Sequence, residues 1–269
     1  MALTQLIVLA VLQTITEVLP VGAEGHLALL SQILHWPDPG AGFRLALKLG
    51  LLLAVMAYFW RDLADMATGV MRAAKGKRDP GAKLALQLAV AAIVTLGAGF
   101  AFEHYAAGDW ETPIVMGWAI VGGALLLLLF DRMCMTVKRI EHATYVDAIV
   151  IGLCQVIALV PGMGSAAITI TMARLLGYER ADAARFYFLL SIPVSIVVIA
   201  RDAYRLVELQ QGAVSNIDIL CAVAGFFAGL IAIAILMAWL RRSTFTPFVV
   251  YRLLLGGAVL ALAYEWVAL

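Results

Sequence analysis

The chain has 269 residues, of which 64% are hydrophobic and 14% are charged, and its mean hydropathy is +0.96. Soluble domains are about half apolar and about a quarter charged, so this composition indicates an integral membrane protein. The formal net charge is +1 and no run of five like charges occurs, which argues against nucleic acid as a partner. Three cysteines lie at spacings that fit neither a zinc site nor a disulfide framework.

Six continuous apolar runs approach the length that an α-helix needs to cross a bilayer, about 20 residues. In chain order they are Phe43 to Trp60, Leu84 to Phe102, Pro113 to Phe130, Phe186 to Ala200, Ile217 to Leu240 and Pro247 to Tyr264. They lack the period-2 alternation of a barrel strand, and a backbone in hydrocarbon must satisfy its own hydrogen bonds. The sequence therefore predicts an all-α fold in one polytopic membrane domain over residues 1–269.

Loop charges predict the orientation, because Lys and Arg are retained on the cytoplasmic side. The loop from Arg61 to Lys83 carries six basic residues and should be cytoplasmic. The same rule places the remaining loops as follows: residues 103–111 outside, 132–139 inside, 177–185 inside, 201–216 outside and Arg241 with Arg242 inside.

Two further segments, Leu3 to Leu34 and Ala148 to Leu176, are each roughly 30 residues long, whereas two full crossings would need about 40. The loop charges place both ends of the second segment inside, so we expect it to enter the membrane and turn back as a re-entrant helix pair. By the same argument the first segment enters from the outside and returns, which leaves both termini outside. A single long tilted crossing also fits the first segment.

Both segments contain a break rich in proline and glycine, at Leu19-Pro20-Val21-Gly22 and at Val160-Pro161-Gly162-Met163-Gly164. Half-helices that meet near the midplane from opposite faces form binding sites in many membrane proteins. Their N-termini offer free N–H groups and a positive dipole end to a phosphate. We therefore interpret the breaks as one site between two repeats, at about residues 1–130 and 145–269. The alternative is two kinked helices whose small residues permit close packing.

Ionisable residues inside a membrane segment are candidates for function. Glu17 could hold a metal ion, a proton or a basic partner, and it shares a helix face with Gln13. His26 could act as general acid, general base or nucleophile, or could instead cap and pack a helix. The other polar residues that gather around the two breaks are Thr14, Thr16, Glu24, Gln155, Ser165, Thr169 and Thr171.

At these residues the chain resembles the BacA/UppP family of bacterial undecaprenyl-diphosphate phosphatases. That family opens with an ExxxE pair followed by PVSSTGH, and the stretch from Gln13 to His26 reads QTITEVLPVGAEGH. The second family motif, PGxSRSGAT, corresponds to PGMGSAAIT from Pro161 to Thr169. The likeness continues in LKLGLLLAVMAYFWRDL (Leu47 to Leu63), ARLLGYERADAARFYFLLSIP (Ala173 to Pro193) and FTPFVVYRLL (Phe245 to Leu254).

The resemblance implies six transmembrane helices plus two re-entrant helix pairs in inverted-topology repeats, in the bacterial plasma (inner) membrane. It implies removal of the terminal phosphate from undecaprenyl diphosphate, a phosphoric anhydride hydrolysis that recycles the lipid carrier for peptidoglycan biosynthesis. A divalent cation, Mg²⁺ or Ca²⁺, would assist. The expected partners are a polyprenyl phosphate or diphosphate lipid and the bilayer, and a homodimer is left open.

Carried over residue by residue, the resemblance implies catalytic roles for Glu17 and His26, which match the family's second glutamate and its histidine. The candidate substrate-binding residues are Gln13, Glu24, Gly25, Gly162, Gly164, Ser165 and Thr169, and the candidate metal ligands are Glu17 and Glu24.

Several family site residues are replaced in this chain. Gln13 stands for the first glutamate, Gly22 and Ala23 stand for two serines, and Ser165 stands for the arginine of the second motif. An arginine fork is a strong donor to a diphosphate, and losing one transition-state donor costs on the order of three powers of ten in rate. Arg174 lies roughly 13 Å further along a helix, too far to replace it unless the chain folds back.

These observations favour a divergent phosphatase in which Glu17 and Glu24 bind a metal ion that replaces the charge of the arginine. One alternative is a homologue that binds or translocates a lipid phosphate without hydrolysing it, since opposed re-entrant loops suit alternating access. A further alternative is a structural or partner-regulating homologue that keeps the scaffold and has lost the chemistry.

Overall fold

The computed structural model describes residues 2–105, 110, 112–134, 136–208 and 214–264. The helices in the described residues are α1 (Leu3–Val18), α2 (Ala23–Leu34), α3 (Ala41–Tyr58), α4 (Trp60–Ala73), α5 (Pro80–Tyr105), α6 (Pro113–Met133), η1 (Ile140–His142), α7 (Tyr145–Cys154), η2 (Gln155–Leu159), α8 (Ser165–Leu175), α9 (Arg180–Glu208), α10 (Asn216–Leu240) and α11 (Thr246–Ala263). Within these residues the chain forms no strand, only one isolated bridge between Lys138 and Tyr178, which confirms the all-α prediction.

The six predicted spans are confirmed as six helices long and apolar enough to cross a membrane: α3, α5, α6, α9, α10 and α11. Helices α9 and α5 exceed the apolar runs that predicted them at both ends. Helix α9 covers 29 residues because its charged first and last turns continue the helix beyond the apolar centre. Helix α5 likewise starts at Pro80, ahead of the predicted Leu84, with proline in the first turn where its missing N–H costs no hydrogen bond.

Local capping explains where several helices begin. The Thr112 side chain accepts a hydrogen bond from the Val115 N–H, and Pro113 follows as the first residue of α6. Thr144 and Asp147 form a reciprocal capping box at the start of α7. Such caps satisfy N–H groups that have no partner within the helix.

The two remaining segments are helices broken at the predicted positions. Between α1 and α2, Gly22 has a φ of 90°, and between η2 and α8, Gly162 and Gly164 have φ values of 94° and 71°. Only glycine adopts these φ angles without strain, and a proline precedes the glycine or glycines in each break. The local sequence therefore determines both breaks. The re-entrant path of these segments and their inverted-repeat relation stay predictions.

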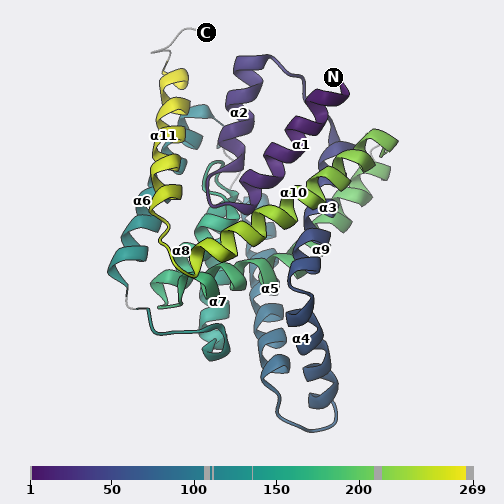
Figure 1. The fold of residues 1–269 in the computed structure, drawn as a ribbon, viewed down its shortest axis with the longest axis vertical. Helices are drawn as coiled ribbons and strands as arrows, with labels where there is room; N and C mark the ends of the chain where they lie inside the picture. The colour runs from purple at the N-terminus through teal and green to yellow at the C-terminus, as the bar shows by residue number, and fades with distance from the viewer. Residues whose placement is uncertain (1, 106–109, 111, 135, 209–213, 265–269) are drawn as a thin grey trace.

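Small residues allow the long helices to pack closely. Helix α10 lies against α1 and α3, and α6 lies against α11 (Figure 1). A Cβ at Gly50 of α3 would lie 2.3 Å from the Ala222 carbonyl oxygen of α10, and one at Gly256 of α11 would lie 3.1 Å from the Gly117 oxygen of α6. Without a hydrophobic driving force between helices in lipid, such backbone contact is a main source of association.

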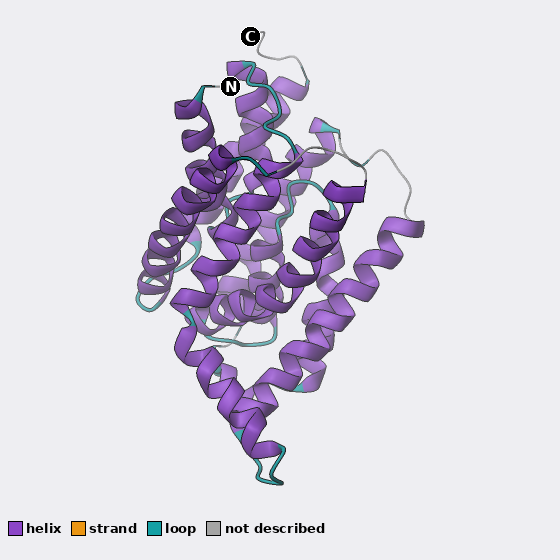
Figure 2. Ribbon diagram, turned by 90° about the vertical axis from the view of Figure 1, so that its right-hand side faces the viewer, coloured by secondary structure: helices purple, strands orange, loops and turns teal. Residues whose placement is uncertain are grey.

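The molecule is elongated, with the α4–α5 hairpin extending from one end (Figures 1 and 2). The start of α1 and the end of α11 both lie at the opposite end. The loop between α4 and α5 and the described ends of the chain thus lie at opposite ends of the molecule, and their placement on opposite sides of a membrane stays a prediction.

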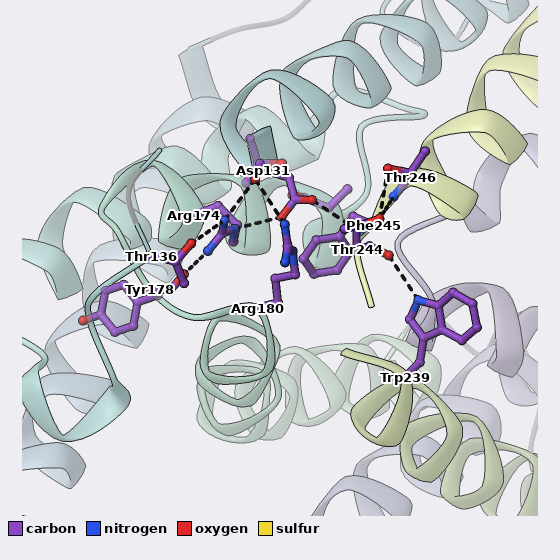
Figure 3. Close-up of polar contacts among 11 residues, drawn as sticks. Asp131, Thr136, Arg174, Tyr178, Arg180, Trp239, Thr244, Phe245 and Thr246 are labelled. Carbon is purple, nitrogen blue, oxygen red and sulfur yellow. Dashed lines mark hydrogen bonds and ion pairs between the residues drawn. The ribbon is translucent and has the colours of Figure 1, made fainter. Parts of the chain in front are cut away.

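A buried ion network joins the ends of α6 and α8 to the start of α9 (Figure 3). Asp131 of α6 accepts hydrogen bonds from Arg174 Nε at 3.0 Å and Arg180 Nε at 2.8 Å, and Arg174 also bonds Thr136 and the Tyr178 carbonyl oxygen. The Asp131 and Arg174 side chains are each 1% exposed. Arg174 is therefore committed to this network, and the chain does not fold back to bring it to the two breaks.

Candidate functional site at the two helix breaks

The two breaks are in direct contact although they are far apart in sequence. The Glu24 carboxylate, at the start of α2, accepts a hydrogen bond of 2.5 Å from the Gly162 N–H. A Cβ at Gly22 would lie 3.8 Å from the Gly162 carbonyl oxygen. The prediction that both breaks belong to one place in the fold is thus supported by contacts between them.

A cavity of about 220 Å³ lies between the breaks, and we call it the inter-loop cavity. Its polar lining comes from Glu17 at the end of α1, Glu24 of α2, Ser165 at the start of α8 and Arg252 of α11. Thr16, Leu19, Pro20, Gly22, Ala23, Ala158, Gly164, Ala166 and Ala167 complete it. The first residues of α8 therefore face a cavity that also holds two carboxylates and one guanidinium.

A second cavity of about 230 Å³ shares Glu17 and Ser165 with the first, and we call it the apolar cavity. Its apolar walls come from α1, α3 and α9: Val18, Leu47, Leu51, Leu52, Val55, Phe188, Val194, Val198 and Ile199. Its polar residues, besides the shared pair, are Gln13, Thr14, Arg44, Lys48, Gln155, Tyr187, Ser191 and Ser195. The two cavities thus meet at Glu17 and Ser165, with polar surroundings on one side and mainly apolar walls on the other.

Two basic residues of α3 line the apolar cavity and are held by ion pairs. Lys48 Nζ lies 2.6 Å from Asp202 of α9, and Arg44 lies 2.5 Å from Asp38 in the loop before α3. The hydrogen bond from Arg44 holds the pKa of the Asp38 carboxyl below its usual value. Both pairs are partly exposed, so these cations remain available to a charged ligand at little energetic cost.

Arg252 is the functional candidate that the sequence reasoning missed. It is fully buried, and its donors reach the carbonyl oxygens of Ile120 at 3.4 Å, Gly162 at 3.0 Å and Met163 at 3.1 Å. It lies within the apolar run Pro247 to Tyr264, so the rule that ionisable residues inside a span indicate function could have identified it.

His26 is close to the site but does not line either cavity. Its Nδ1 lies 2.8 Å from the Gly22 carbonyl oxygen, and its Nε2 lies 2.6 Å from the Tyr251 hydroxyl. The imidazole stacks on the Tyr251 ring and its residue is 8% exposed. His26 therefore connects the first break to α11, next to Arg252.

Of the other predicted site residues, some line a cavity and others contribute to the packing around it. Gln13 lines the apolar cavity and Gly164 the inter-loop cavity. Thr169 is fully buried beneath Ser165, where its hydroxyl bonds the Ser165 carbonyl oxygen and accepts from Gln155 at 2.6 Å. A Cβ at Gly25 would lie 2.6 Å from Ile120, so this glycine lets α2 pack on α6.

The predicted metal ligands, Glu17 and Glu24, line the same cavity. Glu17 is exposed to it, whereas Glu24 is held by the Gly162 N–H. Among the residues described by the structure, no group of three or more His, Cys, Asp or Glu side chains could hold a metal ion by itself. Any cation here would take at most two carboxylates from the protein and the rest of its ligands from substrate and water.

Fold and site together define a polytopic helical membrane protein with a charged cavity where two broken helices meet. Comparison with known proteins then identifies the family: the chain belongs to the family described as bacitracin resistance protein BacA, whose model matches residues 6–258. Undecaprenyl-diphosphatase 1 of Rhodospirillum rubrum is 46% identical, over 98% of this chain and 96% of that protein.

Further relatives cover the same length. The undecaprenyl-diphosphatases of Ruegeria pomeroyi and Roseobacter denitrificans are 40% and 39% identical, each over 98% of this chain and 100% of the relative. The resemblance inferred from the sequence motifs is thereby confirmed, and it extends over nearly the whole chain.

Proposed function

We propose that this protein hydrolyses undecaprenyl diphosphate to undecaprenyl phosphate and inorganic phosphate in the bacterial plasma membrane. The substrate is taken from the names of its relatives. The observation that carries the proposal is that Glu17 and Ser165, one from each broken segment, line both the inter-loop and the apolar cavity. An amphiphile could place its headgroup on one side of these two residues and its hydrocarbon on the other.

The apolar cavity suits the first part of a polyprenyl chain. Leu47 and Leu51 of α3 and Val194 and Val198 of α9 are among the side chains that line it. Each CH₂ group transferred from water to such a surface contributes about 0.8 kcal/mol, so a short isoprenoid segment would add several kcal/mol to binding. The remainder of the chain would extend into the bilayer.

Glu17 is the proposed general base. Its carboxylate is exposed to the cavity, and no hydrogen bond to a described residue occupies it. It accepts a proton from water as the water oxygen forms a bond to the terminal phosphorus. The bond from that phosphorus to the bridging oxygen breaks, and undecaprenyl phosphate leaves with the bonding electron pair. General base catalysis of this kind contributes about 10²–10⁴ in rate.

His26 is proposed as a positioning residue and not as the nucleophile. Both of its ring nitrogens have partners within hydrogen-bond distance, and it lines neither cavity. Its contacts to Gly22 and Tyr251 hold the first break against α11, which keeps Glu24 and Arg252 at the same cavity.

A divalent cation fits the ligands that are present. Mg²⁺ commonly takes one or two carboxylates from a protein and completes its shell with water and substrate phosphates. Glu17 and Glu24 supply such a pair. A bound cation would add to the positive charge of Arg252, which lines the same cavity, and would lower the repulsion between the diphosphate and the two carboxylates.

The proposal is tested by phosphate release from undecaprenyl diphosphate, using the purified full-length protein in detergent. We expect release with Mg²⁺ or Ca²⁺ and a large loss of release in EDTA that is restored by adding the cation. Absence of release under all of these conditions, from protein that is monodisperse and binds the lipid, would contradict hydrolysis and favour the lipid-binding alternative.

A further inference from the structure

The Arg252 guanidinium has one nitrogen, with two N–H groups, that the protein does not use. Its three hydrogen bonds all go to main-chain carbonyl oxygens, of Ile120, Gly162 and Met163. Among the described residues its Nη1 has no hydrogen-bond partner, although it is buried. Leaving a buried charged donor without a partner is costly, so this arrangement is expected where a ligand completes it.

The guanidinium is held in place by its surroundings. A Cβ at Gly123 of α6 would lie 2.6 Å from Nη2 and 3.4 Å from Cζ. Gly123 therefore provides the space that the guanidinium occupies, and the Gly162 and Met163 carbonyl oxygens hold Nη2. Nη1 is left buried and without a hydrogen-bond partner in the described residues, in a residue that lines the inter-loop cavity.

The start of α8 supplies further donors to the same cavity. Gly164, Ser165, Ala166 and Ala167 all line it, and no side chain caps the first N–H groups of this 11-residue helix. A helix N-terminus favours an anion through these free N–H groups and the helix dipole. Guanidinium and helix end thus offer complementary donors across one small cavity.

We propose that Arg252 Nη1 and the N-terminus of α8 form the subsite that binds the terminal phosphate of the diphosphate. Arg252 thereby provides, from the last helix, the positive charge that the second motif lacks at Ser165. The inference rests on the proposed function for the identity of the substrate, but it concerns binding of a phosphate anion and can be tested without turnover. Arg252 would contact the substrate directly.

The test measures binding of inorganic pyrophosphate and of farnesyl diphosphate to the full-length protein in detergent and EDTA, so that no cation contributes. We expect Arg252→Gln to weaken both by roughly 10- to 100-fold, the range for one hydrogen bond to a charged group, with a smaller loss in Arg252→Lys. Arg185→Gln is the matched control, because Arg185 pairs with Asp62 outside both cavities. It should bind both probes as the wild type does.

A second pair of variants keeps the arginine and remains informative if Arg252→Gln does not fold. Gly123→Ala should displace the guanidinium and weaken binding, whereas Gly122→Ala, whose Cβ would meet nothing within 4 Å, should not. Tighter binding of farnesyl diphosphate than of pyrophosphate would identify the lipid headgroup as the ligand; equal binding would identify free pyrophosphate.

Three results would overturn the subsite: wild-type protein that binds neither probe, a folded Arg252→Gln variant that binds both normally, or equal effects of the two glycine substitutions. Binding that depends on Arg252 without any phosphate release would support the subsite and count against hydrolysis. The two proposals therefore fail through different measurements.

Discussion

The contacts of His26 help to decide whether this histidine takes part in the chemistry or only positions other groups. An imidazole that attacks or relays a proton must reach the substrate, yet both nitrogens of His26 already lie within 2.8 Å of Gly22 or Tyr251 oxygens. A histidine that only positions other groups acts through those contacts. Removing the contact partner should then have nearly the same effect as removing the ring.

We expect Tyr251→Phe and His26→Ala each to lower the rate of phosphate release by about tenfold, because each removes one buried hydrogen bond that joins α2 to α11. The pH profile of the remaining activity should keep its shape. A loss of 10³ or more in His26→Ala, with one limb of the pH profile abolished and Tyr251→Phe almost unaffected, would assign His26 to the chemistry instead.

The sequence predicts only some of the residues that form the candidate site. Glu17 and Glu24 were selected because an ionisable group in a membrane segment is costly, and both line the inter-loop cavity. Arg252 obeys the same rule but lies about 90 residues from the second break, and only the packing of α11 on α6 and α2 brings it there. Sequence spacing carries no information about such a contact.

Gly162 is one of the two glycines with positive φ in the break between η2 and α8. Gly162 has a φ of 94°, and its Cβ would lie 2.4 Å from the Met116 carbonyl oxygen of α6. Its N–H bonds Glu24 and its carbonyl oxygen bonds Arg252. This single residue therefore connects both breaks and α11.

Gly162→Ala should destabilise the protein by at least about 1–2 kcal/mol, the cost of a left-handed conformation for a residue with a Cβ, and the contact with Met116 adds to it. Thermal unfolding in detergent measures the effect. Gly97→Ala in α5 is the control, since its Cβ would have no atom within 4 Å, and it should unfold at or above the wild-type temperature. Equal unfolding temperatures for both variants would show that the break tolerates a side chain.

Elements were predicted more completely than residues. Each of the six apolar runs falls on one of the six long apolar helices, because the length of an apolar run is fixed by bilayer thickness and needs no tertiary information. The ends of α9 were missed because its first and last turns are charged; Arg180, for example, is stabilised by Asp131 of another helix. Local composition alone cannot reveal such a partner.

At the scale of the whole molecule, the predicted orientation can be tested by labelling. After replacement of Cys134, Cys154 and Cys221 by serine, single cysteines at Ala2 and Gly76 should react differently with a membrane-impermeant maleimide. We expect labelling at Ala2 from outside intact cells and labelling at Gly76 only after permeabilisation, because the loop between α4 and α5 is basic. The reverse pattern, or labelling of both from one side, would refute the predicted topology.

The labelling of Ala2 also bears on the re-entrant path of the first segment. That path, the inverted repeats and a homodimer all stay predictions. Two ends on the same side require an even number of crossings. Six long helices with two segments that return to their own side satisfy this, whereas a single crossing by α1 and α2 would place Ala2 inside.

The central claim is that the inter-loop cavity is a phosphatase site in which Glu17 acts on the attacking water. It is tested most directly by comparing phosphate release from undecaprenyl diphosphate by the wild type, Glu17→Gln and Glu103→Gln. Glu103 is a partly exposed glutamate of α5 that pairs with Arg201 and lines neither cavity. Loss of the general base should lower release by Glu17→Gln at least 100-fold, while Glu103→Gln retains wild-type activity. A folded Glu17→Gln variant that releases phosphate at the wild-type rate would contradict the claim.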